Sequence, residues 1–157
     1  MSKRSRTEEA ELKALQAALG AEHAAVYGYG VVGARIGAAR QTDARSAYDA
    51  HRARRDELTR EVKDMGAAPE AASAAYVLPF PVTDTAAAIR FAAELEERVA
   101  DVYSDLVRAA TGDRRRMAAG ALREAAVRAV RWSGESVAFP GLAERAGTPS
   151  PTAPSPT

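Results

Sequence analysis

One long interruption, residues 66–83, divides the chain into two halves that otherwise carry the periodicity of α-helices. This segment reads GAAPEAASAAYVLPFPVT, has prolines at positions 69, 79 and 81, and shows no helical repeat. Proline disfavours a helix interior because it lacks the backbone N–H and its ring clashes with the preceding turn. We therefore expect a long loop here, with two helices before it and two after it.

Apolar residues on both sides of this loop recur at alternating spacings of three and four, as one face of an α-helix requires. Abundant alanine and arginine also favour helix, and no run of β-branched and aromatic residues predicts a strand. The sequence therefore predicts an all-α protein. The expected helices run from about Thr7 to Gly37, from Thr42 or Asp43 to Gly66, from Thr83 or Asp84 to Gly112, and from Asp113 to about Trp132.

The lengths of the connections predict how these helices are arranged. Short connections join the first helix to the second and the third to the fourth, so each pair is expected to form an antiparallel hairpin. At about 3.3 Å per extended residue the long loop can span about 60 Å, whereas a helix of about 25 residues is about 37 Å long. One long crossover between helices 2 and 3 is the connection of a ferritin-like four-helix bundle. An up-down bundle with a loose loop is the alternative.

Charge and composition limit the class of protein. The 22 basic and 21 acidic residues are intermixed and leave a net charge of +1, which argues against a nucleic-acid-binding or membrane-surface protein. Cysteine is absent, which excludes disulfides, thiolate metal sites and a cysteine nucleophile. We expect a cytoplasmic protein, because the N-terminus holds no apolar signal segment and no apolar stretch of about 18 residues could span a membrane.

The predicted bundle occupies residues 7–142. Residues 1–6 precede the expected start of the first helix near Thr7 and are expected to be a flexible N-terminus. Residues 143–157 end in GTPSPTAPSPT, a composition rich in proline, serine and threonine that cannot bury an apolar core, so we expect a disordered tail.

Glu22 stands at the centre of the apolar stripe of the first expected helix. The stripe comprises Leu12, Leu15, Leu19, Glu22, Val26, Tyr29, Gly33 and Ile36. A carboxylate in such a position is costly unless it is paired, ligated or protonated. Placing the other helices on a 100° wheel brings further polar side chains inward. The predicted buried polar core consists of Glu22, Tyr48, His51, Arg55, Glu96 and Tyr103.

Three interpretations of this polar core stay open. In the first, Arg55 neutralises Glu22 and Glu96, His51 is a hydrogen-bonded core histidine, and losing one partner would cost about 3–5 kcal/mol. In the second, Glu22, His51 and Glu96 bind iron or manganese. A two-metal site in a bundle needs a Glu from each of two helices and Glu-x-x-His from each of the other two, but Tyr48 replaces one such Glu and the fourth helix has no histidine. In the third, these groups line a small-molecule pocket.

Glycines cluster late in the first expected helix. Residues 28–33, GYGVVG, match the dinucleotide-binding pattern G-x-G-x-x-G, but that pattern is meaningful only after a strand, and here it follows a helical stretch. Gly30, Gly33 and Gly37 share one face, where the missing side chains permit close approach within the bundle or by a second subunit. Ala126 and Val130 lie outside the core face of the fourth helix, so we expect a homodimer to cover this apolar surface.

Four segments carry motifs that are specific as a set. They are ALQAALGAEHAAVYGYGVVG up to Gly33, YDAHRARRDEL from Tyr48, YVLPFPVTD from Tyr76, and AAVRAVRW followed by FPGL. Over about residues 10–142 the chain resembles a bacterial ferritin-like family catalogued as a domain of unknown function. The resemblance implies a ferritin-like four-helix bundle of unassigned role. The wider superfamily implies di-iron or di-manganese chemistry with oxygen, and Tyr48 and the histidine-free fourth helix depart from that pattern.

The sequence thus predicts a non-catalytic binding or structural homodimer with a metal-free polar core. The alternative is a metal-dependent oxidoreductase with a degenerate iron or manganese site at Glu22, His51 and Glu96. No residue is assigned a catalytic role, and whether the chain is an enzyme stays open at this point.

Overall fold

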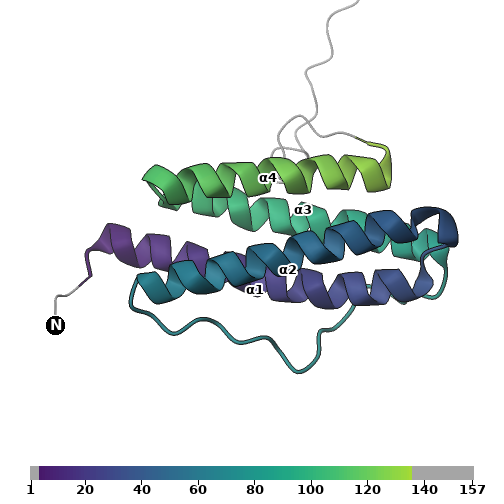
Figure 1. The fold of residues 1–157 in the computed structure, drawn as a ribbon, viewed down its shortest axis with the longest axis horizontal. Coiled ribbons are helices and arrows are strands. Elements are labelled where there is room, and N and C mark those ends of the chain that lie inside the picture. Colours follow the sequence, from purple (N-terminus) through teal and green to yellow (C-terminus); the bar gives the residue numbers. More distant parts are fainter. Residues whose placement is uncertain (1–3, 136–157) are drawn as a thin grey trace, which may run out of the picture.

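The computed structural model describes residues 4–135, which form four long α-helices (Figure 1). The helices are α1 (Arg6–Arg35), α2 (Gln41–Asp64), α3 (Thr85–Ala109) and α4 (Gly112–Ser133), and a short 3-10 helix, η1, spans Ala38–Arg40. No β-strand occurs between residues 4 and 135, so the all-α prediction is confirmed for this part of the chain. The predicted tail at 143–157 and residues 1–3 of the predicted flexible N-terminus lie outside it.

Local capping signals set the ends of the helices. At the start of α1, Ser5 Oγ accepts a hydrogen bond from the Glu8 N–H at 3.2 Å, and Glu8 Oε2 accepts one from the Ser5 N–H at 2.7 Å. This reciprocal capping box starts α1 one residue earlier than predicted. Asp84 Oδ1 caps α3 by accepting from the Ala87 N–H at 2.8 Å. Gly134, in the left-handed region with φ of 76°, follows the end of α4.

Helix α1 packs against both α2 and α3, and α3 also packs against α4. α2 and α3 run in the same direction, opposite to α1 and α4 (Figure 1). Helices α2 and α4 also meet, through long charged side chains. Arg54 Nη2 lies 3.0 Å from Glu124 Oε2, and Arg114 Nε lies 2.7 Å from Glu61 Oε2. Arginines therefore bridge the seam between α2 and α4.

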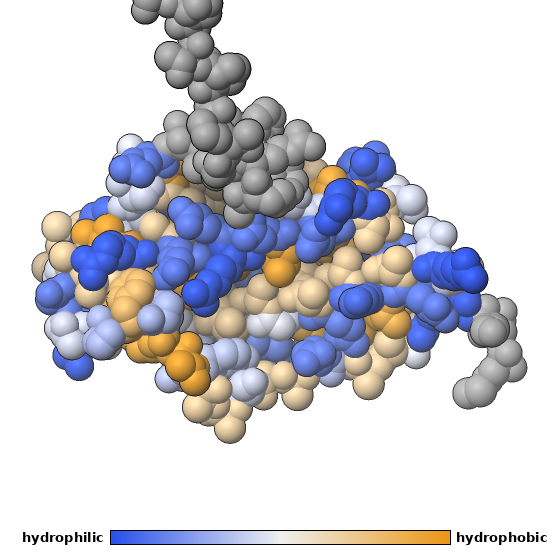
Figure 2. All heavy atoms as spheres, turned by 180° about the vertical axis from the view of Figure 1, so that it is seen from behind, coloured by the Kyte–Doolittle hydropathy of each residue, from blue (hydrophilic) through white to orange (hydrophobic). Residues whose placement is uncertain are grey.

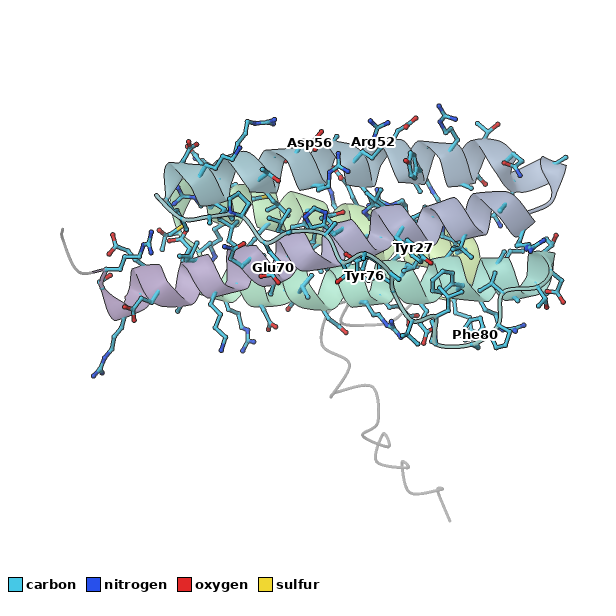
Figure 3. The ribbon with its side chains drawn as sticks, turned by 90° about the horizontal axis from the view of Figure 1, so that it is seen from below. Tyr27, Arg52, Asp56, Glu70, Tyr76 and Phe80 are labelled. Atoms are coloured by element: carbon cyan, nitrogen blue, oxygen red, sulfur yellow. The ribbon has the colours of Figure 1, made fainter. Side chains whose placement is uncertain are left out.

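The loop that joins α2 to α3 lies along α1 (Figures 1 and 3). Near its beginning, Gln16 Nε2 donates to the Ala68 carbonyl oxygen at 2.7 Å. Further along, the rings of Tyr27 and Tyr76 lie with their centroids 5.2 Å apart. At its end, Thr85 Oγ1 donates to the last carbonyl oxygen of α1 at 3.2 Å. Successive parts of the loop thus contact successive parts of α1, from its first half to its C-terminal end.

The apolar core consists of two clusters, one on each side of a polar layer. The first includes Leu15, Leu19, Leu58, Val62, Val99 and Leu106. The second includes Tyr29, Val32, Phe91, Leu95 and Trp132. Along α2 and α3, His51 and Glu96 fall between the positions that contribute to the two clusters, and on α1 Glu22 lies between Leu19 and Ala25, at the end of the first cluster. Hydrophobic burial therefore flanks the candidate site at both ends of the bundle.

Close approach between α1 and α3 depends on Gly28, a position not predicted for this role. A Cβ at Gly28 would lie 2.5 Å from Leu95 Cδ1, well inside van der Waals contact. Cβ atoms at Gly30 and Gly33 would meet no atom within 4 Å. The prediction that these two glycines permit close packing within the bundle is therefore wrong, because a side chain at either position would extend into open space in the described structure.

The described surface is mixed in character. Figure 2 shows hydrophilic residues over much of the rear face, with strongly hydrophobic residues in small, separate groups. Among residues 4–135, the large apolar side chains that are exposed are Tyr27, Val77, Val127 and Val130. None of the described helices combines the length and the apolar character that crossing a membrane requires.

Candidate functional site

Glu22 of α1, His51 of α2 and Glu96 of α3 meet at the centre of the bundle, where their exposed fractions are 1%, 0% and 0%. His51 Nδ1 lies 2.6 Å from Glu22 Oε2, and His51 Nε2 lies 3.0 Å from Glu96 Oε1. The imidazole ring therefore bridges two carboxylates that belong to different helices. The three residues that the sequence singled out as metal ligands are brought together, and the contacts between them have hydrogen-bond distances.

The two carboxylates determine the protonation of His51. Burial alone lowers the pKa of an imidazole, because it disfavours the cation. Here the hydrogen bonds to Glu22 and Glu96 outweigh burial and raise the pKa of His51 to about 9. Burial also acts to raise the pKa of Glu96, but the hydrogen bond and the charge of His51 lower it overall. At neutral pH the ring is thus an imidazolium whose two N–H groups both donate.

Two buried tyrosines add further hydrogen bonds to the carboxylates. Tyr103 Oη donates to Glu22 Oε1 at 2.6 Å, and Tyr29 Oη donates to Glu96 Oε1 at 2.6 Å. Burial first, and then the charge of the adjacent carboxylate, raises the pKa of both phenols well above the usual range. Both hydroxyls therefore stay protonated as donors. The Tyr29 ring also stacks on His51, with centroids 5.3 Å apart.

Helix α4 contributes two residues that were not predicted as members of the polar core. Arg128 Nε donates to Glu96 Oε1 at 2.8 Å, and Trp132 Nε1 donates to Tyr29 Oη at 2.9 Å. A signal for Arg128 was present in the sequence, because it falls within a series of core positions on α4 spaced alternately by three and four. The series is Ala118, Ala121, Ala125, Arg128 and Trp132. We call Glu22, Tyr29, His51, Glu96, Tyr103, Arg128 and Trp132 the charge cluster.

Two predicted members of the polar core lie outside the charge cluster. Arg55 is 27% exposed and its Nη2 lies 2.8 Å from Asp56 Oδ1, so the prediction that it neutralises the buried carboxylates is wrong. Its neighbour Arg54, turned by about 100° on the helix, points into the seam towards Glu124. Tyr48 is half-buried and lines a separate surface pocket.

The charge cluster balances its own charge. Two carboxylates, Glu22 and Glu96, face two cations, His51 and Arg128. A histidine that binds a metal must be neutral and direct a lone pair at the ion, whereas both ring nitrogens of His51 are held by carboxylates. Within residues 4–135, no group of three or more acidic or histidine side chains is arranged to hold a metal ion. In this arrangement the residues do not fit a di-iron or di-manganese centre.

One oxygen of the charge cluster is left without a hydrogen bond. Glu96 Oε1 receives three donors, from Tyr29, His51 and Arg128. Glu96 Oε2 is buried and has no hydrogen-bond partner in the described part of the chain. An unsatisfied buried acceptor normally costs about 1–3 kcal/mol. This oxygen is the position in the cluster with unused capacity to accept a hydrogen bond.

Known proteins resemble this chain over most of its length. Residues 14–144 match the family described as a domain of unknown function (DUF4439). The chain is also similar to a conserved hypothetical protein of Mycobacterium tuberculosis whose crystal structure is known, with 37% identity over 80% of this chain and 96% of that one, and a TM-score of 0.78. No curated protein matches the chain. The matched residues contain the whole charge cluster.

Proposed function

We propose that this chain, which belongs to the family described as a domain of unknown function (DUF4439), is a ferritin-like four-helix bundle with a metal-free core and a binding or structural role. The ferritin-like assignment is supported by the parallel directions of α2 and α3 (Figure 1). It is also supported by the loop between them, which lies along α1 as a crossover between two hairpins would.

The observation that carries the metal-free role is the engagement of both ring nitrogens of His51. Each lies at hydrogen-bond distance from a carboxylate, 2.6 Å from Glu22 and 3.0 Å from Glu96. No lone pair of the imidazolium is then free to bind a metal or to accept a proton from a substrate. In a carboxylate-bridged metal centre, the metal ions neutralise the buried carboxylates. Here His51 and Arg128 would supply that positive charge.

Nitrogen-15 NMR of the imidazole rings tests this role. The chain has two histidines, so a His23→Gln variant leaves the signals of His51 alone. At pH 7 we expect two protonated ring nitrogens, with shifts unchanged by adding a chelator. We also expect far less than one iron or manganese per chain in protein purified without chelator. Stoichiometric metal that disappears in Glu22→Ala would refute the metal-free role.

A metal-dependent oxidoreductase is the second candidate, and it is favoured by one observation. Glu96 Oε2 is buried without a partner among the described residues, so it could accept a metal ion. The other oxygen of the same carboxylate is hydrogen-bonded to His51, which also contacts Glu22. Anaerobic titration with iron(II) tests this candidate. Saturable binding that removes the imidazolium signals of His51, and that is lost in Glu96→Gln, would favour the oxidoreductase over the structural role.

A homodimeric state and a cytoplasmic location stay predictions from the sequence. For the dimer, we expect the contact to include Val127 and Val130 of α4, which are 44% and 37% exposed. Sedimentation equilibrium of the variant with Val127→Glu and Val130→Glu should show a monomer with unchanged helical circular dichroism. Wild-type protein that remains monomeric across the whole concentration range would rule out the dimer.

A further inference from the structure

A surface pocket of about 660 Å³ lies between α1, α2 and the end of the α2–α3 loop. The volume is within the range of about 300–1,000 Å³ that is typical of small-molecule sites, but the pocket is a shallow hollow that is largely open to solvent. None of the side chains that line the pocket belongs to the charge cluster. The pocket is therefore a candidate binding site that is separate from the buried polar layer.

The walls of the pocket are mainly apolar. The lining includes Val26 and Val31 of α1 and Leu78 and Val82 of the loop. Tyr27 also lines the pocket and pairs with a second tyrosine where the loop passes over α1, as Figure 3 shows. Such walls favour the apolar body of a ligand, because burying it removes apolar surface from water.

The charge at the pocket is positive. Arg35 is the one charged side chain among the lining residues. In the described part of the chain, no carboxylate pairs with its guanidinium. Beside the pocket, the guanidinium carbon of Arg52 lies 5.7 Å from the centroid of the Tyr48 ring, which is itself part of the lining. An anionic group on a ligand would complement this charge, and a carboxylate matches the paired donors of a guanidinium.

Gly30 lines the pocket and is exposed. It lies in the interior of α1, where glycine weakens a helix, and a Cβ built there would meet no atom within 4 Å. Nothing in the described structure therefore requires glycine at this position. A side chain at residue 30 would instead occupy the space of the pocket.

We propose that this pocket binds a small amphipathic carboxylate. Its apolar chain or ring lies against Val26, Val31 and Leu78, and its carboxylate pairs with Arg35. The proposal goes beyond the binding or structural role by naming a site and a ligand class. It does not depend on whether the charge cluster holds a metal, because the two sites share no residue.

Calorimetric titration of the full chain with decanoate, below its micelle-forming concentration, tests the ligand class. Two control ligands carry an apolar chain of similar length. Decanol has no charge, and decyltrimethylammonium has a positive charge. We expect saturable binding of decanoate at one site, binding of decanol weaker by about tenfold or more, and no saturable binding of the cation. Decanol that binds as tightly as decanoate would overturn the assignment of an anionic ligand.

Two pairs of variants locate the site. Gly30→Leu should abolish decanoate binding, whereas Gly20→Leu should leave it unchanged, because a Cβ at Gly20 also meets no atom within 4 Å. Arg35→Glu should weaken decanoate binding by about tenfold or more, and Arg6→Glu, which makes the same change in net charge, should not. Thermal unfolding by circular dichroism checks that all four variants fold.

The results that would overturn the proposal are distinct. They are the absence of saturable decanoate binding to the wild type, or undiminished binding to Gly30→Leu. A third is a change from dimer to monomer in Gly30→Leu when the wild type binds no decanoate. That outcome would identify the pocket as a contact with a second copy of the chain rather than a ligand site.

Discussion

Deprotonation of His51 should remove a measurable part of the stability of the fold. The pKa of this buried ring is raised from 6.5 to about 9 by its hydrogen bonds to two carboxylates, against the opposing effect of burial. Because the folded-state pKa is the higher one, this stabilisation is fully present below pH 6.5 and is lost as the pH rises through about 9. A shift of this size is worth about 2 to 3 kcal/mol at pH 7 and close to nothing at pH 10.

Urea unfolding followed by circular dichroism at pH 7 and pH 10 measures this loss. The chain has no cysteine and only three lysines, Lys3, Lys13 and Lys63, but its five tyrosines begin to ionise near pH 10 when unfolded. Because the fold keeps Tyr29 and Tyr103 protonated, these two lower the stability at pH 10 by about 0.4 kcal/mol each. His51→Gln keeps both tyrosines and so measures this smaller part. We expect the free energy of unfolding of the wild type to fall by about 2 to 3 kcal/mol between the two pH values. His23→Gln, which removes the other histidine, should show the same fall.

His51→Gln should be less stable than the wild type at pH 7 by about 3–5 kcal/mol, because the two carboxylates lose the cation between them. Its stability should then change little between pH 7 and pH 10. A wild type whose stability is flat over this interval would refute the reasoning. So would an NMR titration of the wild-type ring, which needs no variant at position 51, if it gave a pKa below 7.

Three further predictions concern single side chains. Arg128→Met should lower the free energy of unfolding by about 3–5 kcal/mol, since a buried carboxylate loses its guanidinium, whereas the exposed Arg131→Met should change it by less than about 0.5 kcal/mol. Tyr29→Phe should cost about 1–3 kcal/mol in urea unfolding, because it removes a hydroxyl that donates to a carboxylate and accepts from an indole N–H; a smaller effect would mean that the hydroxyl is dispensable. In thermal unfolding, Gly33→Ala should stabilise the fold by about 1 kcal/mol, but Gly28→Ala should lose this gain because its Cβ overlaps a leucine of α3.

The local features of the fold could be predicted from the sequence. The ends of the helices differ from expectation by a few residues at most, because caps such as Ser5 and Asp84 act on backbone groups within one turn. The helical wheel also placed Glu22, His51 and Glu96 on inward faces, and all three are buried in the structure. A side chain's direction from its own helix axis is a local property, so periodicity is enough to assign it.

The partners of these residues could not be predicted in the same way. Arg54 and Arg55 lie on either side of the inward face of α2. Which of the two forms an ion pair with another helix depends on where α4 and its Glu124 lie. The spacing of α4 places Arg128 on the core face, but which buried carboxylate its long side chain reaches depends on how α4 packs against α3. Which of several arginines neutralises a buried acid is thus a property of how the helices are arranged.

The charge cluster gives the bundle a means of fixing the alignment of its helices. Glu96 Oε1 of α3 accepts hydrogen bonds from Tyr29 of α1, His51 of α2 and Arg128 of α4, at 2.6, 3.0 and 2.8 Å. Sliding any one helix by a turn, about 5.4 Å, would break its contact and leave a buried charge or hydroxyl unpaired, at a cost of several kcal/mol. The alanines on the facing surfaces discriminate poorly between such alignments, because small side chains interlock little. A polar layer with donors from three helices on one oxygen supplies the discrimination that the apolar clusters on either side lack.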